Sequence, residues 1–573
     1  MQKVQKPARY TGGEYNQIVK DIKDVDVRVA LCFPDTYEIG MSNLGVRIIY
    51  GILNGMDGVW CERVFAPWVD MEEQMRSGDI ALYGLESGDP ICGFDIVAFS
   101  IGYELSYTNV LNMLDLAGIP LRSKDRPDNA PLVIAGGTCC FNPEPLFCFI
   151  DMFVIGEGEE VVTEIVERFR LSRGAGMSRH GFLRSAAEID GVYVPSLYDV
   201  KYNDDGTISG IRPDEGVVMP VKKRVVKDFE SSYFPVDTIV PSTEIVHDRV
   251  VLELFRGCIR GCRFCQAGHV NAPVRFRRCE TLIRQGIEAI SASGYDEIAL
   301  SSLSSSDYKQ LNELCDGLLS WCEPRNVSLS LPSLRADNFS VELMERIQKV
   351  RKSGLTFAPE AGTQRLRDVI NKNVTEEDLL ETCRVAFEGG WNGVKLYFML
   401  GLPTETDEDV IAIADLSRAV LHIWKKYAKN KNRGVRITVS TSCFVPKAFT
   451  PLQWEAQISI EEYLRRVELL RSSLRTKAIT YNWHSPEQGH IEAALARGDR
   501  RVGDAVEAAW RFGARLDSWS EHFSMERWLK AFKQSGLEPS YYACREREKG
   551  EILPWSLVNA GTARNAELWG NDE

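Results

Sequence analysis

Three cysteines stand close together at a spacing that suits metal chemistry. Cys258, Cys262 and Cys265 follow the pattern Cys-x3-Cys-x2-Cys within the segment RGCIRGCRFCQAG. Thiolates are soft ligands that bind iron–sulfur clusters or zinc. Three thiolates bind three irons of a [4Fe–4S] cluster and leave the fourth iron without a protein ligand. S-adenosylmethionine (SAM) can chelate that iron through its amino and carboxylate groups.

The same segment is open to a second interpretation. Together with His269, the three cysteines have the residue types of a Cys3His zinc site. The sequence that follows carries alternating strand and helix patterns to about residue 450, which a small zinc module would not need. This favours the cluster, and a zinc-binding protein is kept as the alternative.

The elements that must position these cysteines follow the pattern of a barrel. Six strand–helix units match a partial (β/α)6 TIM-type barrel over residues 250–450, with its chemistry at the carboxyl ends of the strands. The cysteines directly follow the first strand. The strand candidates are 251–256, 297–301, 327–331, 355–358, 393–399 and 435–440, with helices at 280–293, 341–353 and 376–388.

Three further regions are expected outside the barrel. Buried apolar runs alternate with helical spacing over residues 1–185, which predicts a Rossmann-like, doubly wound α/β domain. Short extended pieces with turns predict a β-rich connector at 186–249, and residues 451–573 read as a helical, Trp-containing C-terminal region. The runs of the first domain are 27–33, 96–100, 132–135 and 152–155.

Composition narrows the class of protein. The chain has 573 residues, 15 cysteines and a net charge of -13. An acidic total argues against a large phosphate-binding surface. No apolar run reaches the length of about 18 residues that a membrane span needs, and the start MQKVQKPARY is not a secretory signal. We therefore expect a cytoplasmic protein without a membrane partner, whose cysteines are mostly buried thiols.

With the cysteine motif and the barrel pattern in place, the chain resembles the radical SAM superfamily. It resembles the branch with an N-terminal cobalamin (B12)-binding-type domain, and within it an uncharacterised bacterial family. The resemblance covers nearly the whole chain. It is carried by RGCIRGCRFCQAG and by QKVQKPARYTGGEYN, ERVFAPWVDME, YELSYTNVLNMLDLAGIPLR, LSSLSSSDY, FAPEAGTQRLRDVINK, HSPEQGH and RGDRRVG.

This resemblance implies an activity. Such an enzyme reductively cleaves SAM at a [4Fe–4S] cluster to a 5′-deoxyadenosyl radical, with electrons from a flavodoxin- or ferredoxin-type donor. The substrate class is RNA, protein or a metabolite, and the reaction is methyl transfer, sulfur insertion or another radical modification. The run Phe444–Lys447 resembles methylthiotransferase barrels, whereas no second cluster motif is evident. No residue is assignable as a catalytic acid or radical relay.

The resemblance also implies a SAM pocket. Phe264 is expected beside the adenine, Glu360 at the ribose hydroxyls and Arg335 at the carboxylate. The serines after the second strand are expected at the amine, and a Gly-x-Pro element near the adenine. Helix capping, a surface position and plain turns are the structural alternatives. The serines are Ser301 and Ser302, with Ser304–Ser306, and the last element is Gly401 and Pro403.

A corrinoid signature is only partly present in the first domain. Its first part reads Asp35-Thr-Tyr37-Glu-Ile-Gly40, with Tyr37 in place of the histidine that would ligate cobalt. Ser100, Gly136 and Gly137 match the remainder. Cobalamin binding is therefore open, and a scaffold that has lost its ligand is the other interpretation.

One rival function is not enzymatic. The chain would then be an iron–sulfur RNA or ribosome accessory factor that does not cleave SAM. Its partner surface would be the Trp-rich C-terminal region, although burial in a helical core is the commoner role of tryptophan.

Overall fold

The computed structural model describes residues 3–331 and 355–561, which form two compact units. Among these residues, the first unit comprises 3–248, 494–542 and 548–561, and the second comprises 249–331, 355–493 and 543–547. The region 451–573, expected as one helical part, is thus divided between the two units. No described helix is long and apolar enough to cross a membrane.

The first unit is built on a six-stranded sheet of order β2-β1-β3-β4-β5-β6. All neighbouring strands are parallel except β5 and β6. Every residue of β2 is buried, as expected for a sheet covered on both faces. The strands are β1 (Val27–Phe33), β2 (Val59–Phe65), β3 (Ile96–Ser100), β4 (Leu132–Gly136), β5 (Met152–Val154) and β6 (Val192–Tyr193).

This strand order confirms the predicted doubly wound fold. Its topological switch point lies between β1 and β3, where the connections leave in opposite directions. Helices α4 and α16 pack together, which places part of the C-terminal region in this unit. The helices are α1 (Tyr37–Gly40), α2 (Leu44–Asn54), α3 (Val69–Gly78), α4 (Tyr107–Leu116), α5 (Val161–Gly174), α6 (Arg179–Ala186), α16 (Val502–Arg511), α17 (Met525–Gln534) and α18 (Pro539–Ala543).

Short strands complete the first unit. The antiparallel hairpin β7–β8 and the parallel pair β9–β19 lie outside the main sheet. The segment expected as a connector thus contributes β6 to the main sheet as well as this hairpin. The strands are β7 (Tyr198–Tyr202), β8 (Ile208–Pro213), β9 (Val221–Lys222) and β19 (Val558–Asn559).

The second unit contains two parallel sheets, β10-β13-β14 and β15-β16-β17-β18. Residues 332–354, between β14 and β15, include the expected helix 341–353 and lie outside the described part of the chain. The strands are β10 (Val250–Glu253), β11 (Phe255–Arg256), β12 (Arg275–Phe276), β13 (Glu297–Ser301), β14 (Ser328–Ser330), β15 (Leu355–Glu360), β16 (Gly393–Leu400), β17 (Arg436–Cys443) and β18 (Ile479–Trp483).

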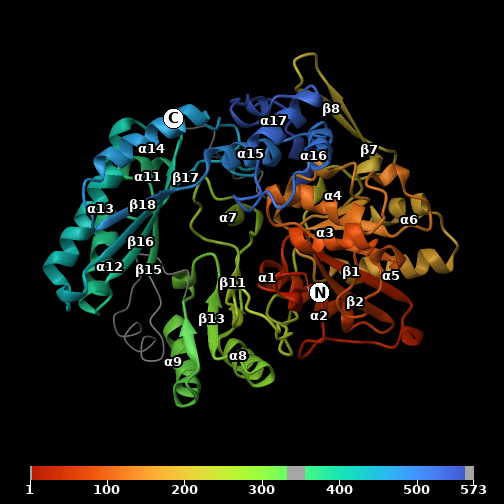
Figure 1. The fold of residues 1–573 in the computed structure, drawn as a ribbon, viewed down its shortest axis with the longest axis horizontal. Coiled ribbons are helices and arrows are strands. Elements are labelled where there is room, and N and C mark those ends of the chain that lie inside the picture. The colour runs from red at the N-terminus through yellow and green to blue at the C-terminus, as the bar shows by residue number, and fades with distance from the viewer. Residues whose placement is uncertain (1–2, 332–354, 562–573) are drawn as a thin grey trace. The chain divides into compact units, whose positions relative to one another are not determined.

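Six barrel strands were expected, and the structure adds β18 as a seventh parallel strand. Helices α12, α13 and α14 lie along one face of its sheet (Figure 1). The helices of this unit are α7 (Gln266–Val270), α8 (Cys279–Ser293), α9 (Leu311–Cys322), α11 (Gln364–Val369), α12 (Glu376–Glu388), α13 (Asp407–Tyr427), α14 (Ile460–Ser473) and α15 (Pro486–Ala496), whose last residues pass into the first unit.

Candidate functional site

The three motif cysteines lie on one loop between β11 and α7, and each is partly buried. Two glycines allow the loop to turn, because Gly257 and Gly261 have φ angles of +83° and +67°. A Cβ atom at Gly257 would lie 3.0 Å from the Pro273 carbonyl oxygen. Glycine is therefore required where this loop passes close to the segment after α7.

Two of the motif cysteines, Cys258 and Cys265, lie beside Gly268. The Cys265 amide donates to the Cys262 carbonyl at 3.2 Å. A Cβ at Gly268 would lie 3.8 Å from Cys265 Sγ and 3.9 Å from Cys258 Cβ. Burial raises the pKa of Cys265, negative charge on Cys258 raises it further, and Lys372 lowers it. A positive metal centre beside Cys265 would oppose this effect of burial and favour its thiolate.

His269 is not placed as the fourth ligand of a zinc ion. Its Nε2 lies 3.2 Å from the Cys262 carbonyl oxygen, and burial lowers its pKa. In the described part of the chain, no three His, Cys, Asp or Glu side chains are grouped around a position for one metal ion. A [4Fe–4S] cluster differs because each thiolate binds a separate iron.

The segment after α11 fixes the cysteine loop from the other side. Arg263 donates from its backbone amide to the Ile370 carbonyl at 3.0 Å and from Nη1 to the Val369 carbonyl at 2.9 Å. Asn371 Nδ2 donates to the Gly261 carbonyl at 2.9 Å. The loop is thereby held against the residues that follow β15.

Glu360, the expected ribose ligand, lies at the same place. It ends β15 with a φ of +69°, a conformation that non-glycine residues rarely adopt and that is common at functional sites. Its Oε1 lies 3.1 Å from Lys372 Nζ. Lys372 Nζ lies 5.8 Å from the ring centroid of Phe264. Burial raises the pKa of Glu360, and the Lys372 charge opposes this.

Phe264, the expected adenine neighbour, packs against a hydrophobic cluster under the loop. Phe264 belongs to the cysteine loop, and Lys372, the ion-pair partner of Glu360, lies near its ring, so the loop and Glu360 are close to one another. The buried members of the cluster are Ala361, Leu366, Ile370, Leu402, Phe444 and Leu452.

The serines after β13 form a turn that is bonded mainly to itself. Ser301 is the last residue of β13, and Ser302 Oγ lies 3.0 Å from Ser305 Oγ and accepts from the Ser304 amide at 3.2 Å. The turn is linked to the cysteine loop, because Arg260 Nε donates to Asp307 at 2.8 Å.

The Gly-x-Pro element follows β16. Gly401 has a φ of +88°, and its amide donates to Glu405 Oε2 at 2.7 Å. Pro403 follows two residues later, beside Leu402 of the hydrophobic cluster. Arg335, the expected carboxylate ligand, lies outside the described residues.

The residues of the corrinoid signature are held by partners within the first unit. Tyr37 is buried and donates its hydroxyl proton to Glu14. A side chain at Gly40 would collide with the ring of Phe65. Asp35 accepts hydrogen bonds from Trp519 Nε1 at 2.9 Å and Ser518 Oγ at 3.0 Å, and burial raises its pKa.

The remaining signature residues lie at the carboxyl ends of β3 and β4. Ser100 ends β3 and pairs in register with Gly136 of β4. Gly137 has a φ of +108°, and a Cβ there would lie 2.5 Å from the Ile101 carbonyl oxygen. The backbone of Ile101 therefore fills the space beside Gly137.

Residues 516–519, which we call the strap, cross the carboxyl ends of β2 and β1 and the start of α4. The Leu516 amide donates to Asn109 Oδ1 at 2.8 Å, and Thr108 Oγ1 donates to Asp517 Oδ2 at 2.9 Å. The ring of Trp519 meets that of Trp68 edge to face at 5.2 Å. Burial raises the pKa of Asp517 to about 6.

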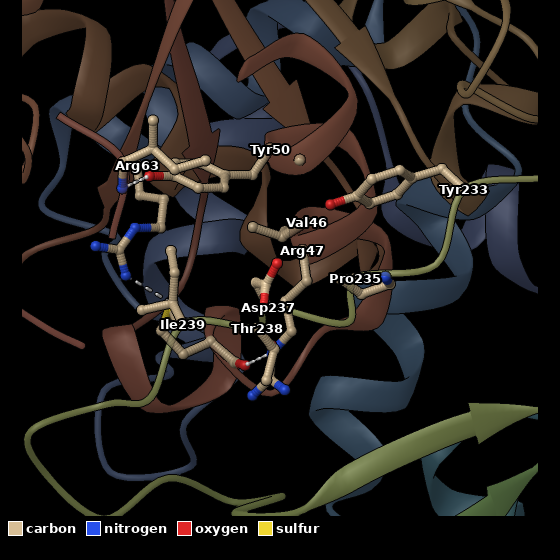
Figure 2. A pocket seen from close by; sticks show the side chains of 12 residues that line it. Val46, Arg47, Tyr50, Arg63, Tyr233, Pro235, Asp237, Thr238 and Ile239 are labelled. Carbon is tan, nitrogen blue, oxygen red and sulfur yellow. Dashed lines mark hydrogen bonds between the residues drawn. The ribbon is translucent and has the colours of Figure 1, made fainter. Parts of the chain in front are cut away.

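The first unit also contains a small pocket, which was not expected from the sequence. Figure 2 shows it between α2 and residues 233–239, with Tyr50 and Arg63 on one side and Tyr233 on the other. Arg63 donates to Glu14 at 2.6 Å and to Glu86 at 2.7 Å. The pocket wall thus belongs to the buried charge network that also holds Tyr37.

Lys372 was also not predicted as a site residue from the sequence. It lies between Asn371 and Asn373, whose φ angles are +52° and +46°. Asparagine tolerates this left-handed conformation better than most residues. The Asn-Lys-Asn sequence is therefore the signal that predicts a tight turn presenting the lysine.

Comparison with protein families matches two parts of the chain. Residues 252–417 match the radical SAM superfamily, and residues 45–195 match the family described as radical SAM proteins, N-terminal. These matches confirm the resemblance to the radical SAM superfamily.

Three similar proteins each match more than half of the chain. An uncharacterized protein of Methanocaldococcus jannaschii, MJ0966, is 27% identical over 91% of this chain and 99% of its own length. A putative methylthiotransferase of the same organism, MJ0865, is 23% identical over 56% of this chain and 64% of its own length. The solved structure of the cobalamin-dependent SAM radical enzyme OxsB is similar over 88% of this chain and 72% of that one, at 12% identity and a TM-score of 0.49.

Proposed function

Because the chain belongs to the radical SAM superfamily, we propose that it is an enzyme that reductively cleaves SAM and modifies an RNA, protein or metabolite substrate. The observation that supports this most is the meeting of two features at one place. The loop of Cys258, Cys262 and Cys265 is held against the segment after β15 that carries the Glu360–Lys372 pair.

The thiols fit a [4Fe–4S] cluster. Cys258 and Cys265 lie beside Gly268, and Cys262 is joined to Cys265 by a backbone hydrogen bond, so each cysteine of this loop would supply one thiolate to a separate iron. When bound, the cluster and SAM supply one-electron cleavage of a carbon–sulfur bond, for which radical SAM enzymes need a reductant. A flavodoxin- or ferredoxin-type donor is the proposed partner.

The side chains beside the loop would bind and orient SAM. Glu360 would accept hydrogen bonds from two vicinal ribose hydroxyls, while Lys372 holds the carboxylate in place. Phe264 would offer its ring to the adenine. Ser301, Ser302, Arg335, Gly401 and Pro403 are proposed for the rest of the pocket.

The six residues proposed for a corrinoid do not fit one in this arrangement. Tyr37 is buried against Glu14, Asp35 is bonded to the strap, and the Ile101 backbone lies against Gly137. No step through cobalt is therefore part of the proposed function, and the first unit is proposed to act as a scaffold.

Purification without oxygen, followed by reduction in the presence of SAM, tests the proposal. We expect an iron–sulfur protein that produces 5′-deoxyadenosine and methionine, with reduced flavodoxin or dithionite as electron donor. A cluster without SAM cleavage would instead support an RNA or ribosome accessory factor. Zinc without iron would support the Cys3His alternative.

A further inference from the structure

A second group of thiols lies at the carboxyl end of β17, apart from the motif cysteines. Cys443 is the last residue of β17. Cys544 belongs to residues 543–547, which return to the second unit after the chain has passed through the first. Its Sγ lies 3.8 Å from Nδ1 of His490, a residue of α15. Both cysteines are thiols and are partly buried.

One residue, Gln457, bonds to the backbone beside all three members of this group. Its side-chain Nε2 donates to the carbonyls of Phe444 at 3.2 Å and Gly489 at 3.1 Å, and its backbone N–H donates to the Ala543 carbonyl at 3.0 Å. These carbonyls belong to residues adjacent in sequence to Cys443, His490 and Cys544. Three segments far apart in the chain are thus held together at this point.

The packing of Gly489 confirms that the group is compact. A Cβ atom there would lie 3.7 Å from Cys443 Cβ, so glycine is what allows α15 to come this close to the end of β17. The group also adjoins the proposed SAM site, because Phe444 belongs to the hydrophobic cluster against which Phe264 packs.

The two thiols differ in their surroundings. Burial raises the pKa of Cys443 to about 12, and negative charge on Cys544 contributes to this shift. Burial also lowers the pKa of His490, which a charge on Glu461 opposes, so the imidazole is neutral at pH 7 and has an acceptor nitrogen. Cys544 is the thiol with a proton acceptor at its side, as in activated cysteine nucleophiles.

We propose that Cys544 is a nucleophilic thiol, with His490 as its proton acceptor and Cys443 as its disulfide partner, at a site that reacts with small disulfides. His490 takes the proton of Cys544, and the thiolate sulfur attacks a disulfide RSSR to give a mixed disulfide and RSH. Cys443 then attacks the Cys544 sulfur and releases the second RSH. The protein loses two electrons and two protons, which RSSR gains.

Alkylation rates measured within one molecule test the nucleophile. The fully folded protein is pulsed with iodoacetamide at pH 7, and peptide mapping compares Cys544 with Cys92, an exposed cysteine of the first unit. We expect Cys544 to react about tenfold faster than Cys92, although it is less exposed. A rate at Cys544 no faster than at Cys92 overturns the proposal.

A histidine variant tests the proton acceptor. His490→Gln should lower the Cys544 rate about tenfold and leave the Cys92 rate unchanged. The matched control is His422→Gln, at an exposed position of α13 in the same unit, which should change neither rate. Equal Cys544 rates in the wild type and His490→Gln would remove His490 from the proposed site.

Oxidised glutathione tests the disulfide partner. We expect the wild type to yield the crosslinked Cys443–Cys544 peptide pair, lighter by two hydrogens, and Cys443→Ala to retain glutathione on Cys544. A wild type that keeps glutathione on Cys544 overturns the role of Cys443. Neither assay uses SAM or reductant, so failure here is separable from failure of the proposed SAM cleavage.

Discussion

Lys372 Nζ lies 3.1 Å from Glu360 Oε1, directly beside the cysteine loop. The pair joins the end of β15 to the turn after α11, and that turn also binds the cysteine loop through Asn371. One short segment therefore supports both the proposed cluster ligands and the proposed ribose ligand. Loss of either charge should therefore lower the affinity for SAM more than it lowers the iron content.

Replacing Glu360 tests the ribose assignment. Glu360→Ala should retain iron and weaken SAM binding about tenfold or more, because a hydrogen bond to a charged group contributes about 1.5–3 kcal/mol. Equilibrium binding to the anaerobic protein measures this. Glu381→Ala, at an exposed position of α12, is the control and should bind SAM as the wild type does. Unchanged affinity in Glu360→Ala would refute the assignment.

Replacing the motif cysteines tests the cluster. The wild type purified without oxygen should contain about four iron and four sulfide per chain. The combined Cys258→Ala, Cys262→Ala and Cys265→Ala variant should contain neither, as measured by metal and sulfide analysis and the loss of brown colour. Cys92→Ala should keep both. One zinc per chain without iron in the wild type would contradict the radical SAM assignment.

Asp517 should make the stability of the first unit depend on pH. Its folded-state pKa of about 6 lies above the ordinary value of 3.8 because the carboxyl group is buried. The folded state therefore holds the proton more tightly, and this contribution is fully present below pH 3.8 and is lost as the pH rises to about 6. The shift corresponds to at most about 3 kcal/mol.

Thermal unfolding of Asp517→Asn against wild type measures that effect. The amide cannot titrate, so the stability of the wild type relative to the variant should fall between pH 4 and 6 and then stay constant. A difference that is constant from pH 4 to 8 would show that Asp517 keeps an ordinary pKa.

Hydroxocobalamin tests the scaffold role of the first unit. We expect no binding at high micromolar cofactor, because Asp35 already bonds Ser518 and Trp519 of the strap. Absorbance spectra of the desalted protein provide the measurement. Stoichiometric retention of cobalamin would show that the strap leaves Asp35, and would restore cobalt chemistry to the possible reactions.

The sequence predicted the features that depend on local pattern. The runs 27–33 and 96–100 are β1 and β3 with the same bounds, because strands buried on both faces are continuous apolar runs. The cysteine motif also contains Gly257 and Gly261, which both have the positive φ angles that a tight loop requires. Glu360 was proposed from its motif, but its left-handed backbone conformation was not predicted.

Features that depend on distant contacts were not predicted. Strand β18 has the sequence ITYNW, whose polar residues give no clear run, and it is defined by its pairing with β17. The strap and the return of residues 543–547 arise from tertiary packing, for which a single sequence carries no periodic signal. Lys372 acquires its role only because α11 brings it back to Glu360.

The second unit is assembled from discontinuous parts of the gene. A recombinant fragment ending at residue 493 would carry the motif cysteines, Glu360 and His490, yet would lack Cys544 and the Ala543 carbonyl that Gln457 binds. Genetic exchange of the barrel between relatives would meet the same restriction. The barrel and the sequence that follows it are therefore expected to be inherited and to evolve as one block.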